Sequence, residues 1–291
     1  MIRVRPKTLL QKYTGPLREH YGEGEAEAIC RLLLQESLQI DRAKLMINDE
    51  MDVDDDQVLF FDKAIDRLLK DEPVQHILGF AYFYDRPFSV NEHVLIPRQE
   101  TEELVSLIID QYPGGKIDLL DIGTGTGCIP ITLALALPQV KATGLDVSEE
   151  ALHIAQQNAN KLNAVVEFVR KDILQDDIQG RYDVIVSNPP YITQAERTTM
   201  HANVLDYEPG LALFVPNNDP LRFYRRITAL AIDHLKPGGR LYFEINEHYG
   251  SETKDLLDES GFSETRLISD LNGKHRIVTG YIQPTSSDSI L

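Results

Sequence analysis

The chain has 291 residues, of which 42% are hydrophobic and 26% are charged. This balance excludes a disordered chain, and the length indicates two domains or one domain with an appendage. Over the whole chain, acidic side chains outnumber basic ones by 46 to 29, and the net charge is −17. The parts before and after residue 85 are each acidic. Because proteins that follow nucleic-acid phosphates carry basic surfaces, this charge argues against a general DNA or RNA binder.

The two cysteines, Cys30 and Cys128, form no CxxC pair and have no histidine cluster beside them. We therefore expect neither a disulfide framework nor a metal site, and the chain suits a reducing compartment. The basic N-terminal segment lacks an apolar stretch long enough for a signal peptide. The longest apolar run, residues 129–137, is too short to cross a bilayer. These features predict a soluble cytoplasmic protein that does not enter a membrane.

The first 75 residues are predicted to be helical, because apolar side chains recur at helical spacing in residues 26–34 and 58–69. Between these stretches lies the acidic run Asp52-Val53-Asp54-Asp55-Asp56, which is typical of a solvated loop and a helix start. A metal site is the weaker alternative, because no glycine or closing glutamate stands at the spacing of a calcium-binding loop. We expect residues 1–78 to form an N-terminal helical domain.

Residues 79–98 change character, because prolines and a glycine interrupt them. The segments 81–84 and 88–90 have the pattern of short hairpin strands, and we expect residues 79–98 to link two domains. A helix is predicted from Gln99 to Tyr112, at the start of a second domain that spans residues 99–284. Residues 285–291 are expected to be a flexible tail.

From residue 116 onward, predicted strands alternate with predicted helices, which implies a mainly parallel sheet covered by helices on both faces. Strands are expected at residues 117–122, 140–145, 165–169, 182–187, 239–245, 264–269 and 276–282, and helices after the first strand as far as 137, at 149–162 and at 221–234. This is a Rossmann-like α/β architecture. Its first and fourth strands lie side by side at the switch point of the sheet.

A glycine turn, Gly123-Thr124-Gly125-Thr126-Gly127, follows the first strand and opens a helix. Glycine is needed where a turn takes positive φ or where the backbone must approach a ligand closely. We expect the whole turn to hold a nucleotide-like ligand at the carboxyl end of the sheet. A dinucleotide is disfavoured, because Cys128 stands where its third glycine is expected. Cys128 itself is expected to be a small core residue.

Three acids follow successive strands: Asp121, Asp146 and Asp172. Asp146 could accept hydrogen bonds from both hydroxyls of a ribose. Asp172 could meet an adenine amino group, with Ile173 against the ring. Asp121 stands just before the turn, where it would oppose a pyrophosphate but would suit an amino group or a sulfonium cation. S-adenosylmethionine has both of these groups. The alternative for each acid is a role in a cap or a turn.

The fourth strand ends in Ser187-Asn188-Pro189-Pro190-Tyr191. Asn188 carries a side-chain carbonyl, and the two prolines hold their backbone carbonyls stiffly without an N–H donor. A target NH₂ group can donate one hydrogen to the Asn188 carbonyl and one to the Pro189 carbonyl. Tyr191 offers an aromatic face to the planar group that bears the NH₂. A rigid turn is the alternative, but it is less favoured opposite the glycine turn.

These motifs resemble those of the peptide chain release factor N5-glutamine methyltransferase family, and the resemblance covers most of the chain. It rests on Glu72–Gly79 (EPVQHILG), Ile96–Glu102 (IPRQETE), Gly123–Gly127, Asn188–Tyr191, and Glu208-Pro209 with Ala212-Leu213. The first two segments separate this family from other Asn-Pro-Pro-Tyr methyltransferases. Ile173 departs from the pattern, because some members have a tryptophan there. An apolar contact with adenine would replace aromatic stacking.

The resemblance implies a class I S-adenosylmethionine-dependent methyltransferase fold with a small N-terminal helical domain. It implies N5-methylation of the glutamine in the Gly-Gly-Gln motif of bacterial-type class I release factors. By the same resemblance, the helical domain helps to dock the release factor, and Asn188 to Tyr191 hold the glutamine. We expect a monomer without direct nucleic-acid binding. The residues implied to contact the cofactor are Gly123, Gly125, Gly127, Asp146 and Asn188.

The sequence leaves two possible roles open for some residues near these motifs. Arg98 could pair with Glu100 or Glu102, or it could touch the substrate. Glu208 could bind the substrate or brace the loop that follows the Asn-Pro-Pro-Tyr segment. His76 lies in a short apolar stretch and is expected to be packed or hydrogen-bonded rather than catalytic.

Two rival functions use the same motifs. An adenine-N6 methyltransferase acting on DNA or RNA also targets a planar group that bears an NH₂, but it needs a basic approach surface, and base flipping if its substrate is a duplex. The acidic charge and the Glu72–Gly79 and Ile96–Glu102 motifs argue against it. A catalytically inactive adapter is the second rival, which the intact glycine turn and Asn-Pro-Pro-Tyr segment disfavour.

Overall fold

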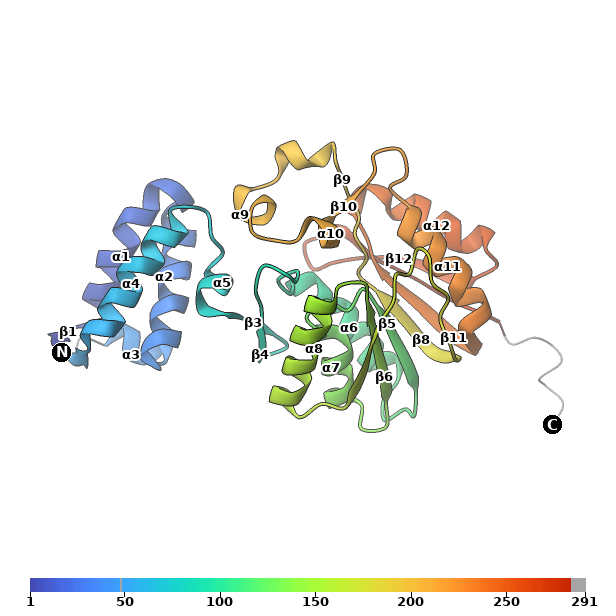
Figure 1. Cartoon of the computed structure of the whole chain (residues 1–291), viewed down its shortest axis with the longest axis horizontal. Coiled ribbons are helices and arrows are strands. Elements are labelled where there is room, and N and C mark those ends of the chain that lie inside the picture. The colour runs from blue at the N-terminus through green and yellow to red at the C-terminus, as the bar shows by residue number, and fades with distance from the viewer. Residues whose placement is uncertain (48, 284–291) are drawn as a thin grey trace. The chain divides into compact units, whose positions relative to one another are not determined.

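The computed structural model describes residues 1–47 and 49–283 and divides the chain into two compact units (Figure 1). The helical unit contains Met1–Phe80 and His201–Tyr207, and the sheet unit contains Ala81–Met200 and the chain from Glu208 onward. The sequence predicts a helical domain of residues 1–78 and a separate linker of residues 79–98. In the structure, residues 81–98 group with the sheet unit. The predicted tail, residues 285–291, and residue 284 lie outside the described residues.

In the described part of the N-terminal segment, five helices and a short two-stranded ladder build the helical unit. The helices are α1 (Pro6–Tyr21), α2 (Glu23–Leu38), α3 (Arg42–Met46), α4 (Asp55–Leu68) and α5 (Val74–Leu78), and the antiparallel strands are β1 (Ile2–Val4) and β2 (Met51–Val53). Their apolar faces meet around fully buried Leu17, Leu33 and Phe61. The helical prediction is confirmed, and the β1–β2 ladder was missed.

The acidic run begins helix α4, as the sequence predicts, but Asp52 and Val53 belong to strand β2 and not to a loop. The Asp54 side chain accepts a hydrogen bond from the Gln57 backbone N–H at 2.6 Å, and the Gln57 side chain accepts one from the Asp54 N–H at 3.0 Å. This reciprocal pair is a capping box, which satisfies two N–H groups that the helix start leaves unpaired.

A distant segment completes the helical unit. Helix α9 (Ala202–Leu205) lies within His201–Tyr207, and the Tyr207 hydroxyl donates a hydrogen bond to the Lys70 carbonyl at 2.8 Å. The chain that leaves the Asn-Pro-Pro-Tyr segment therefore enters the helical unit before it returns to the sheet unit at Glu208.

The sheet unit contains a seven-stranded sheet with the order β12-β13-β11-β8-β5-β6-β7. The pairs from β11 to β7 are parallel, and β12 and β13 are antiparallel at one edge. The mainly parallel sheet and the adjacent first and fourth strands are confirmed. The strands are β5 (Asp118–Ile122), β6 (Lys141–Asp146), β7 (Val166–Arg170), β8 (Tyr182–Ser187), β11 (Leu235–Glu244), β12 (Ser263–Ser269) and β13 (His275–Tyr281).

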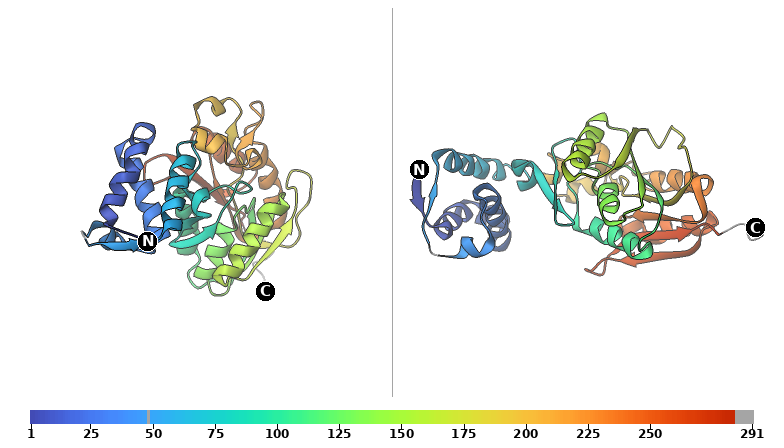
Figure 2. Two further views of the ribbon diagram at one scale, coloured as in Figure 1. Left: turned by 60° about the vertical axis from the view of Figure 1, so that its left-hand side comes forward. Right: turned by 90° about the horizontal axis from the view of Figure 1, so that it is seen from below.

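Helices cover both faces of this sheet, as predicted (Figures 1 and 2). Alternate side chains of β5 point to opposite faces: Leu119 packs with the α6–α8 side, and Leu120 packs with the α11–α12 side. Cys128 is buried on the first side, which confirms it as a core residue. The helices are α6 (Gln99–Gln111), α7 (Cys128–Ala136), α8 (Glu149–Leu162), α11 (Arg222–His234) and α12 (Gly250–Glu259), of which α12 was not predicted.

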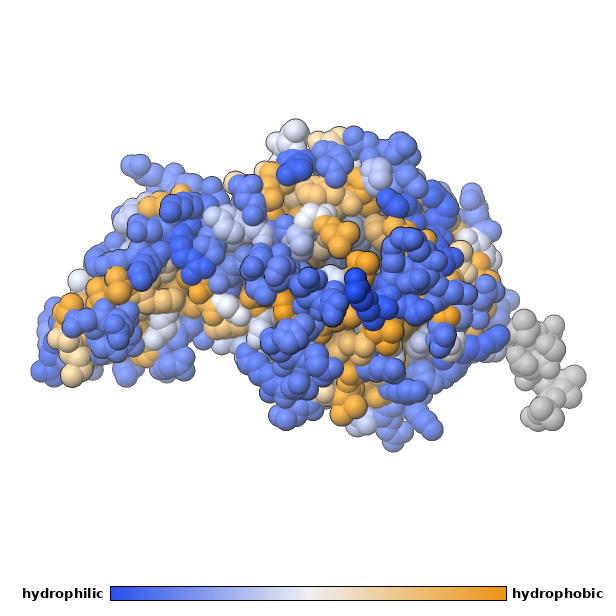
Figure 3. Space-filling model, in the orientation of Figure 1, coloured by the Kyte–Doolittle hydropathy of each residue, from blue (hydrophilic) through white to orange (hydrophobic). Residues whose placement is uncertain are grey.

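Shorter elements surround the sheet. The predicted hairpin forms from β3 (Phe80–Phe83) and β4 (Arg86–Ser89), and β9 (Ile192–Thr193), β10 (Phe214–Val215) and α10 (Gly210–Leu213) follow β8. Hydrophilic residues cover most of the face in Figure 3. Within the described residues, no helix is both long and apolar enough to cross a membrane.

Candidate functional site

The loops that follow β5 and β8 meet at the carboxyl end of the sheet. Ile122, the last residue of β5, pairs with Ser187, the last residue of β8. A Cβ atom placed on Gly123 would lie 3.9 Å from the Asn188 carbonyl oxygen. The predicted meeting of the glycine turn and the Asn-Pro-Pro-Tyr segment across the switch point is therefore confirmed.

The glycine turn is held by backbone hydrogen bonds. The N–H groups of Gly123 and Thr124 both donate to the Leu145 carbonyl at 2.8 Å, and the Gly127 N–H donates to the Thr124 carbonyl at 2.8 Å. Gly123, Gly125 and Gly127 have φ values of 78°, 52° and 78°, in the left-handed region that favours glycine. Glycine therefore allows the backbone to take this conformation at all three positions without strain.

Gly127 has a packing role that the other two glycines lack. A Cβ atom on Gly127 would lie 2.9 Å from Ile131 Cδ1 in α7 and 3.2 Å from Ala155 Cβ in α8, whereas one on Gly125 would meet none of the described atoms within 4 Å. Gly127 also precedes α7 as its N-cap residue. Gly127 therefore lets α7 pack closely, and Gly123 and Gly125 leave space for a ligand.

Substitution of Gly127 by alanine should destabilise the protein more than the same change at Gly125. Both variants carry the strain of a left-handed residue, which costs about 1–2 kcal/mol, and Gly127→Ala adds a packing clash worth about 1–3 kcal/mol. Urea unfolding of the two variants measures the difference. Equal losses of stability would show that the contact with Ile131 relaxes without cost.

The carboxylate of Asp146, at the end of β6, is held by two backbone donors. The Gly125 N–H donates to Asp146 Oδ2 at 2.9 Å, and the Ser148 N–H donates to Oδ1 at 3.0 Å. Burial raises the pKa of Asp146, and the backbone donors oppose this rise. Asp146 thus joins the glycine turn to the end of the neighbouring strand.

Asp172 and Ile173 follow β7. The Asp172 side chain accepts hydrogen bonds from the Leu174 N–H at 3.0 Å and from the Gln175 side chain at 2.5 Å, so it organises a turn. Ile173 is 8% exposed and belongs to the core on the α11 side. Asp172 therefore has the turn role that the sequence analysis gave as an alternative. It also lines the cavity described below.

Asp121 lies behind the glycine turn and is fully buried. Among the described residues, neither of its carboxylate oxygens has a hydrogen-bond partner in good geometry. Burial raises the pKa of Asp121 from 3.8 to about 7, a rise that the nearby Thr124 hydroxyl partly offsets. An unpartnered buried carboxylate destabilises a protein, so this residue favours a positively charged group close to the turn.

The pKa of Asp121 predicts a pH-dependent stability of the cofactor-free protein. The folded-state pKa of about 7 lies above the unfolded-state value of 3.8, so the folded form binds more protons between these pH values. Stability from this group is therefore present below about pH 4 and lost as the pH rises through 7. We expect Asp121→Asn to raise the free energy of unfolding at pH 8 by at least about 1 kcal/mol.

Urea unfolding at pH 8 and pH 5 tests this expectation, with Asp110→Asn on the exposed side of α6 as the control. The stabilisation by Asp121→Asn should shrink at pH 5, and the control should show no pH-dependent difference. A gain of the same size at both pH values would contradict the titration of Asp121.

The Asn-Pro-Pro-Tyr segment is fixed at both ends by a buried hydrogen-bond network. Asn188 Nδ2 donates to Thr101 Oγ1 at 3.4 Å, and the Thr101 hydroxyl donates to Glu244 Oε2 at 2.6 Å. The Tyr191 hydroxyl donates to Glu244 Oε1 at 3.3 Å. Glu244 is 1% exposed. One carboxylate therefore connects to the first and last residues of the segment.

Arg98 pairs with Glu208, not with Glu100 or Glu102, the two partners considered from the sequence. The Arg98 guanidinium donates to Glu208 Oε1, and the Ile96 N–H donates to Glu208 Oε2 at 3.1 Å. The Glu208 side chain is 1% exposed. This ion pair joins the loop before α6 to the start of the segment that holds Pro209.

A cavity of about 280 Å³ opens beside the two loops. Several predicted site residues line it: Gly123, Gly125, Asp146, Asp172, Ile173, Asn188, Pro189 and Pro190. The other predicted residues lie outside its lining: Asp121, Thr124, Thr126, Gly127, Tyr191, Arg98 and Glu208. Tyr191 is partly buried against the core, and its role as an aromatic face for the substrate stays a prediction.

Relatives of known name share both units of this chain. Residues 8–79 match the family model described as PrmC N-terminal domain, and residues 100–206 match the methyltransferase small domain. A release factor glutamine methyltransferase of Bacteroides thetaiotaomicron is 47% identical over 90% of this chain and 95% of its own length. Proteins with that name from Flavobacterium psychrophilum and Bacillus subtilis are 42% and 36% identical, over 94% and 89% of this chain and 97% and 92% of theirs. The chain belongs to the release factor glutamine methyltransferase family.

A solved structure agrees with the fold expected for this family. A methyltransferase of Pyrococcus furiosus superimposes with a TM-score of 0.53 at 20% identity, over 76% of this chain and 98% of that one. At this identity the likeness concerns the fold alone. The class I methyltransferase fold predicted from the sequence is confirmed.

Sequence reasoning missed Glu244 and Thr101 as parts of the hydrogen-bond network around the Asn-Pro-Pro-Tyr segment. Glu244 is a single acid in an apolar strand, GRLYFEI, and that isolation was the available signal. It also missed the apolar rim of the cavity, to which Leu95, Leu211 and Phe223 contribute.

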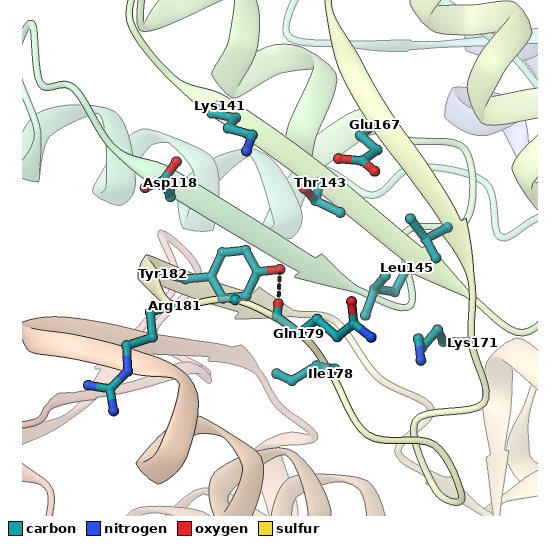
Figure 4. A pocket seen from close by; sticks show the side chains of 12 residues that line it. Asp118, Lys141, Thr143, Leu145, Glu167, Lys171, Ile178, Gln179, Arg181 and Tyr182 are labelled. Carbon is teal, nitrogen blue, oxygen red and sulfur yellow. Dashed lines mark hydrogen bonds between the residues drawn. The ribbon is translucent and has the colours of Figure 1, made fainter.

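A second cavity of about 420 Å³ lies over the sheet between β5–β7 and the segment before β8 (Figure 4). Charged side chains such as Lys141, Glu167 and Arg181 line it, and the Tyr182 hydroxyl donates to the Gln179 carbonyl at 2.7 Å. None of the residues predicted for the site lines this cavity.

Proposed function

We propose that this protein transfers a methyl group from S-adenosylmethionine to the side-chain amide nitrogen of a glutamine in a peptide chain release factor. The observation that carries the proposal is the 47% identity to a release factor glutamine methyltransferase over 90% of the chain. Residues 8–79 match the PrmC N-terminal domain, and residues 100–206 match the methyltransferase small domain. Within the release factor, the proposed methylated residue is the glutamine of the Gly-Gly-Gln motif of bacterial-type class I release factors.

The cavity residues fit S-adenosylmethionine. The turn presents Gly123 and Gly125 without side chains, and the unpartnered Asp121 carboxylate lies behind it. Asp146 would hold the ribose hydroxyls. Asp172 and Ile173 would meet the adenine. Asp121 lies outside the cavity lining, so its negative charge would act on the methionine amino group or the sulfonium through the turn rather than by direct contact.

The Asn188 side chain and the Pro189 backbone would position the target nitrogen. The Asn188 side-chain amide donates a hydrogen bond from Nδ2 to Thr101. Among the described residues, no donor reaches its Oδ1. This oxygen and the Pro189 carbonyl would accept the two amide hydrogens of the glutamine. When bound, S-adenosylmethionine supplies an electrophilic methyl group on a sulfonium sulfur. Positioning of this kind is worth about 7–11 kcal/mol in favourable cases.

No strong base is required in the loop. An amide nitrogen is a poor nucleophile, but the methylated nitrogen would carry a positive charge and both of its hydrogens, and would then lose one proton readily to give the neutral N-methyl amide. The residues of the Asn-Pro-Pro-Tyr segment therefore act by orientation and fixed polarity rather than by proton abstraction. The helical unit, a match to the family's N-terminal domain, would help to dock the release factor.

The activity is tested by transfer of a radiolabelled methyl group from S-adenosylmethionine to purified substrates. Purified release factor should become labelled, and double-stranded DNA and tRNA should remain unlabelled. The net charge of −17 supports this preference, since it disfavours approach to phosphates. Label in the adenine bases of the nucleic acids, with none in the release factor, would establish the adenine-N6 alternative instead.

A further inference from the structure

A fully buried carboxylate lies under the Asn-Pro-Pro-Tyr segment, and the mechanism above does not use it. Glu244 ends β11, next to β8, where Phe243 pairs with Ser187. Burial raises the pKa of Glu244, and the Thr101 hydrogen bond and the Arg276 charge oppose this rise. A buried carboxylate is costly unless its oxygens are hydrogen-bonded, and here both oxygens accept from a hydroxyl.

The direction of the hydrogen bonds follows from the number of protons. The Thr101 hydroxyl has a single proton, and it donates that proton to Glu244 Oε2 at 2.6 Å. Thr101 Oγ1 can then only accept from Asn188. The side-chain amide of Asn188 must turn its donor, Nδ2, toward Thr101. Its acceptor, Oδ1, consequently faces away from Thr101.

We propose that Thr101, with its proton held by Glu244, is a positioning residue that fixes which end of the Asn188 amide faces the target nitrogen. The inference rests on the proposed function, in which Asn188 accepts a hydrogen from the glutamine. If the amide turned over, Asn188 would present N–H donors to an NH₂ group that also donates. The target nitrogen would lose one of its two acceptors, while the cavity for the cofactor would stay unchanged.

The position of Thr101 suits this task. It lies in the first turn of α6, is 3% exposed, and reaches Glu244 across 143 positions of sequence. Valine has nearly the same shape as threonine but neither donates nor accepts. Thr132 in α7 provides a matched control, because it is fully buried and its hydroxyl has no hydrogen-bond partner among the described residues.

The test compares Thr101→Val, Thr101→Ser, Thr132→Val and Asn188→Ala in steady-state methylation of a release factor. We expect Thr101→Val to lower kcat by about 10- to 100-fold, the range found when a residue that orients a metal ligand from behind is removed. Its Kd for S-adenosylmethionine and KM for the release factor should stay close to the wild-type values. Thr101→Ser, which keeps the hydroxyl, should restore most of kcat, and Thr132→Val should match the wild type.

The outcomes separate this inference from the proposed function. If Asn188→Ala is inactive but Thr101→Val keeps full kcat, Thr101 does not position Asn188 and the inference fails alone. If Thr101→Ser is as slow as Thr101→Val, the hydroxyl is not the active feature and the inference also fails. If Asn188→Ala keeps full kcat, or the wild-type protein does not methylate release factors, the proposed function fails first.

Discussion

Replacement of Asn188 by alanine is expected to abolish methyl transfer while the affinity for S-adenosylmethionine stays within about threefold of the wild-type value. The variant removes the side-chain carbonyl that would accept a hydrogen from the glutamine amide. It leaves Asp146, which would hold the ribose, in its hydrogen bonds to Gly125 and Ser148. Single-turnover methylation and calorimetric titration of the cofactor measure the two effects separately.

The control for this experiment is Asn160→Ala, on the exposed side of α8. It should leave both methylation and cofactor affinity unchanged. Full residual methylation by Asn188→Ala would remove the Asn-Pro-Pro-Tyr segment from the mechanism. A large loss of cofactor affinity would instead make Asn188 mainly a cofactor ligand.

Replacement of Asp146 by alanine is expected to show the opposite pattern. The variant removes the acceptor of the Gly125 N–H and the carboxylate that would bind the ribose hydroxyls. Hydrogen bonds to a charged group are worth about 1.5–3 kcal/mol each, so the Kd for S-adenosylmethionine should rise by roughly 10- to 100-fold. At saturating cofactor, much of the transfer rate should return, because the Asn188 network is untouched.

Calorimetric titration measures this change, with Asp146→Asn as the matched variant. Asparagine keeps one acceptor oxygen for the turn but loses the charge, and we expect an intermediate Kd. An unchanged Kd in Asp146→Ala would show that the cofactor does not contact this carboxylate. Parallel loss of stability is checked by urea unfolding, since Asp146 also supports the glycine turn.

Features with a local signature could be predicted from the sequence. The alternation of strands and helices has a clear period, so the α/β sheet and its switch point followed from connectivity rules. Because β5 and β8 are neighbours, the meeting of Gly123 with Asn188 followed as well. The helix start at Asp54 was also predicted correctly, since a helix cap depends only on residues nearby.

Features that depend on distant residues could not be predicted. The Thr101–Glu244 hydrogen bond joins positions 143 apart in the sequence, and Arg98 meets Glu208 across 110 positions. Neither pair has a spacing that a local pattern could reveal, so nearby acids were considered for Arg98 instead. The return of His201–Tyr207 to the helical unit has the same cause, because it is set by tertiary packing. Asp121, Asp146 and Asp172 looked alike in sequence, but Asp121 alone proved to lie behind the turn without a partner.

The central claim, glutamine methylation, is tested most directly by mass spectrometry of a release factor after incubation with the protein and S-adenosylmethionine. The release factor is used with its Gly-Gly-Gln glutamine intact and with that glutamine replaced by alanine. We expect one added methyl group on the glutamine of the intact motif and none on the variant. A methyl group on another residue, an equal modification of the variant, or no modification of either protein would contradict the proposed function.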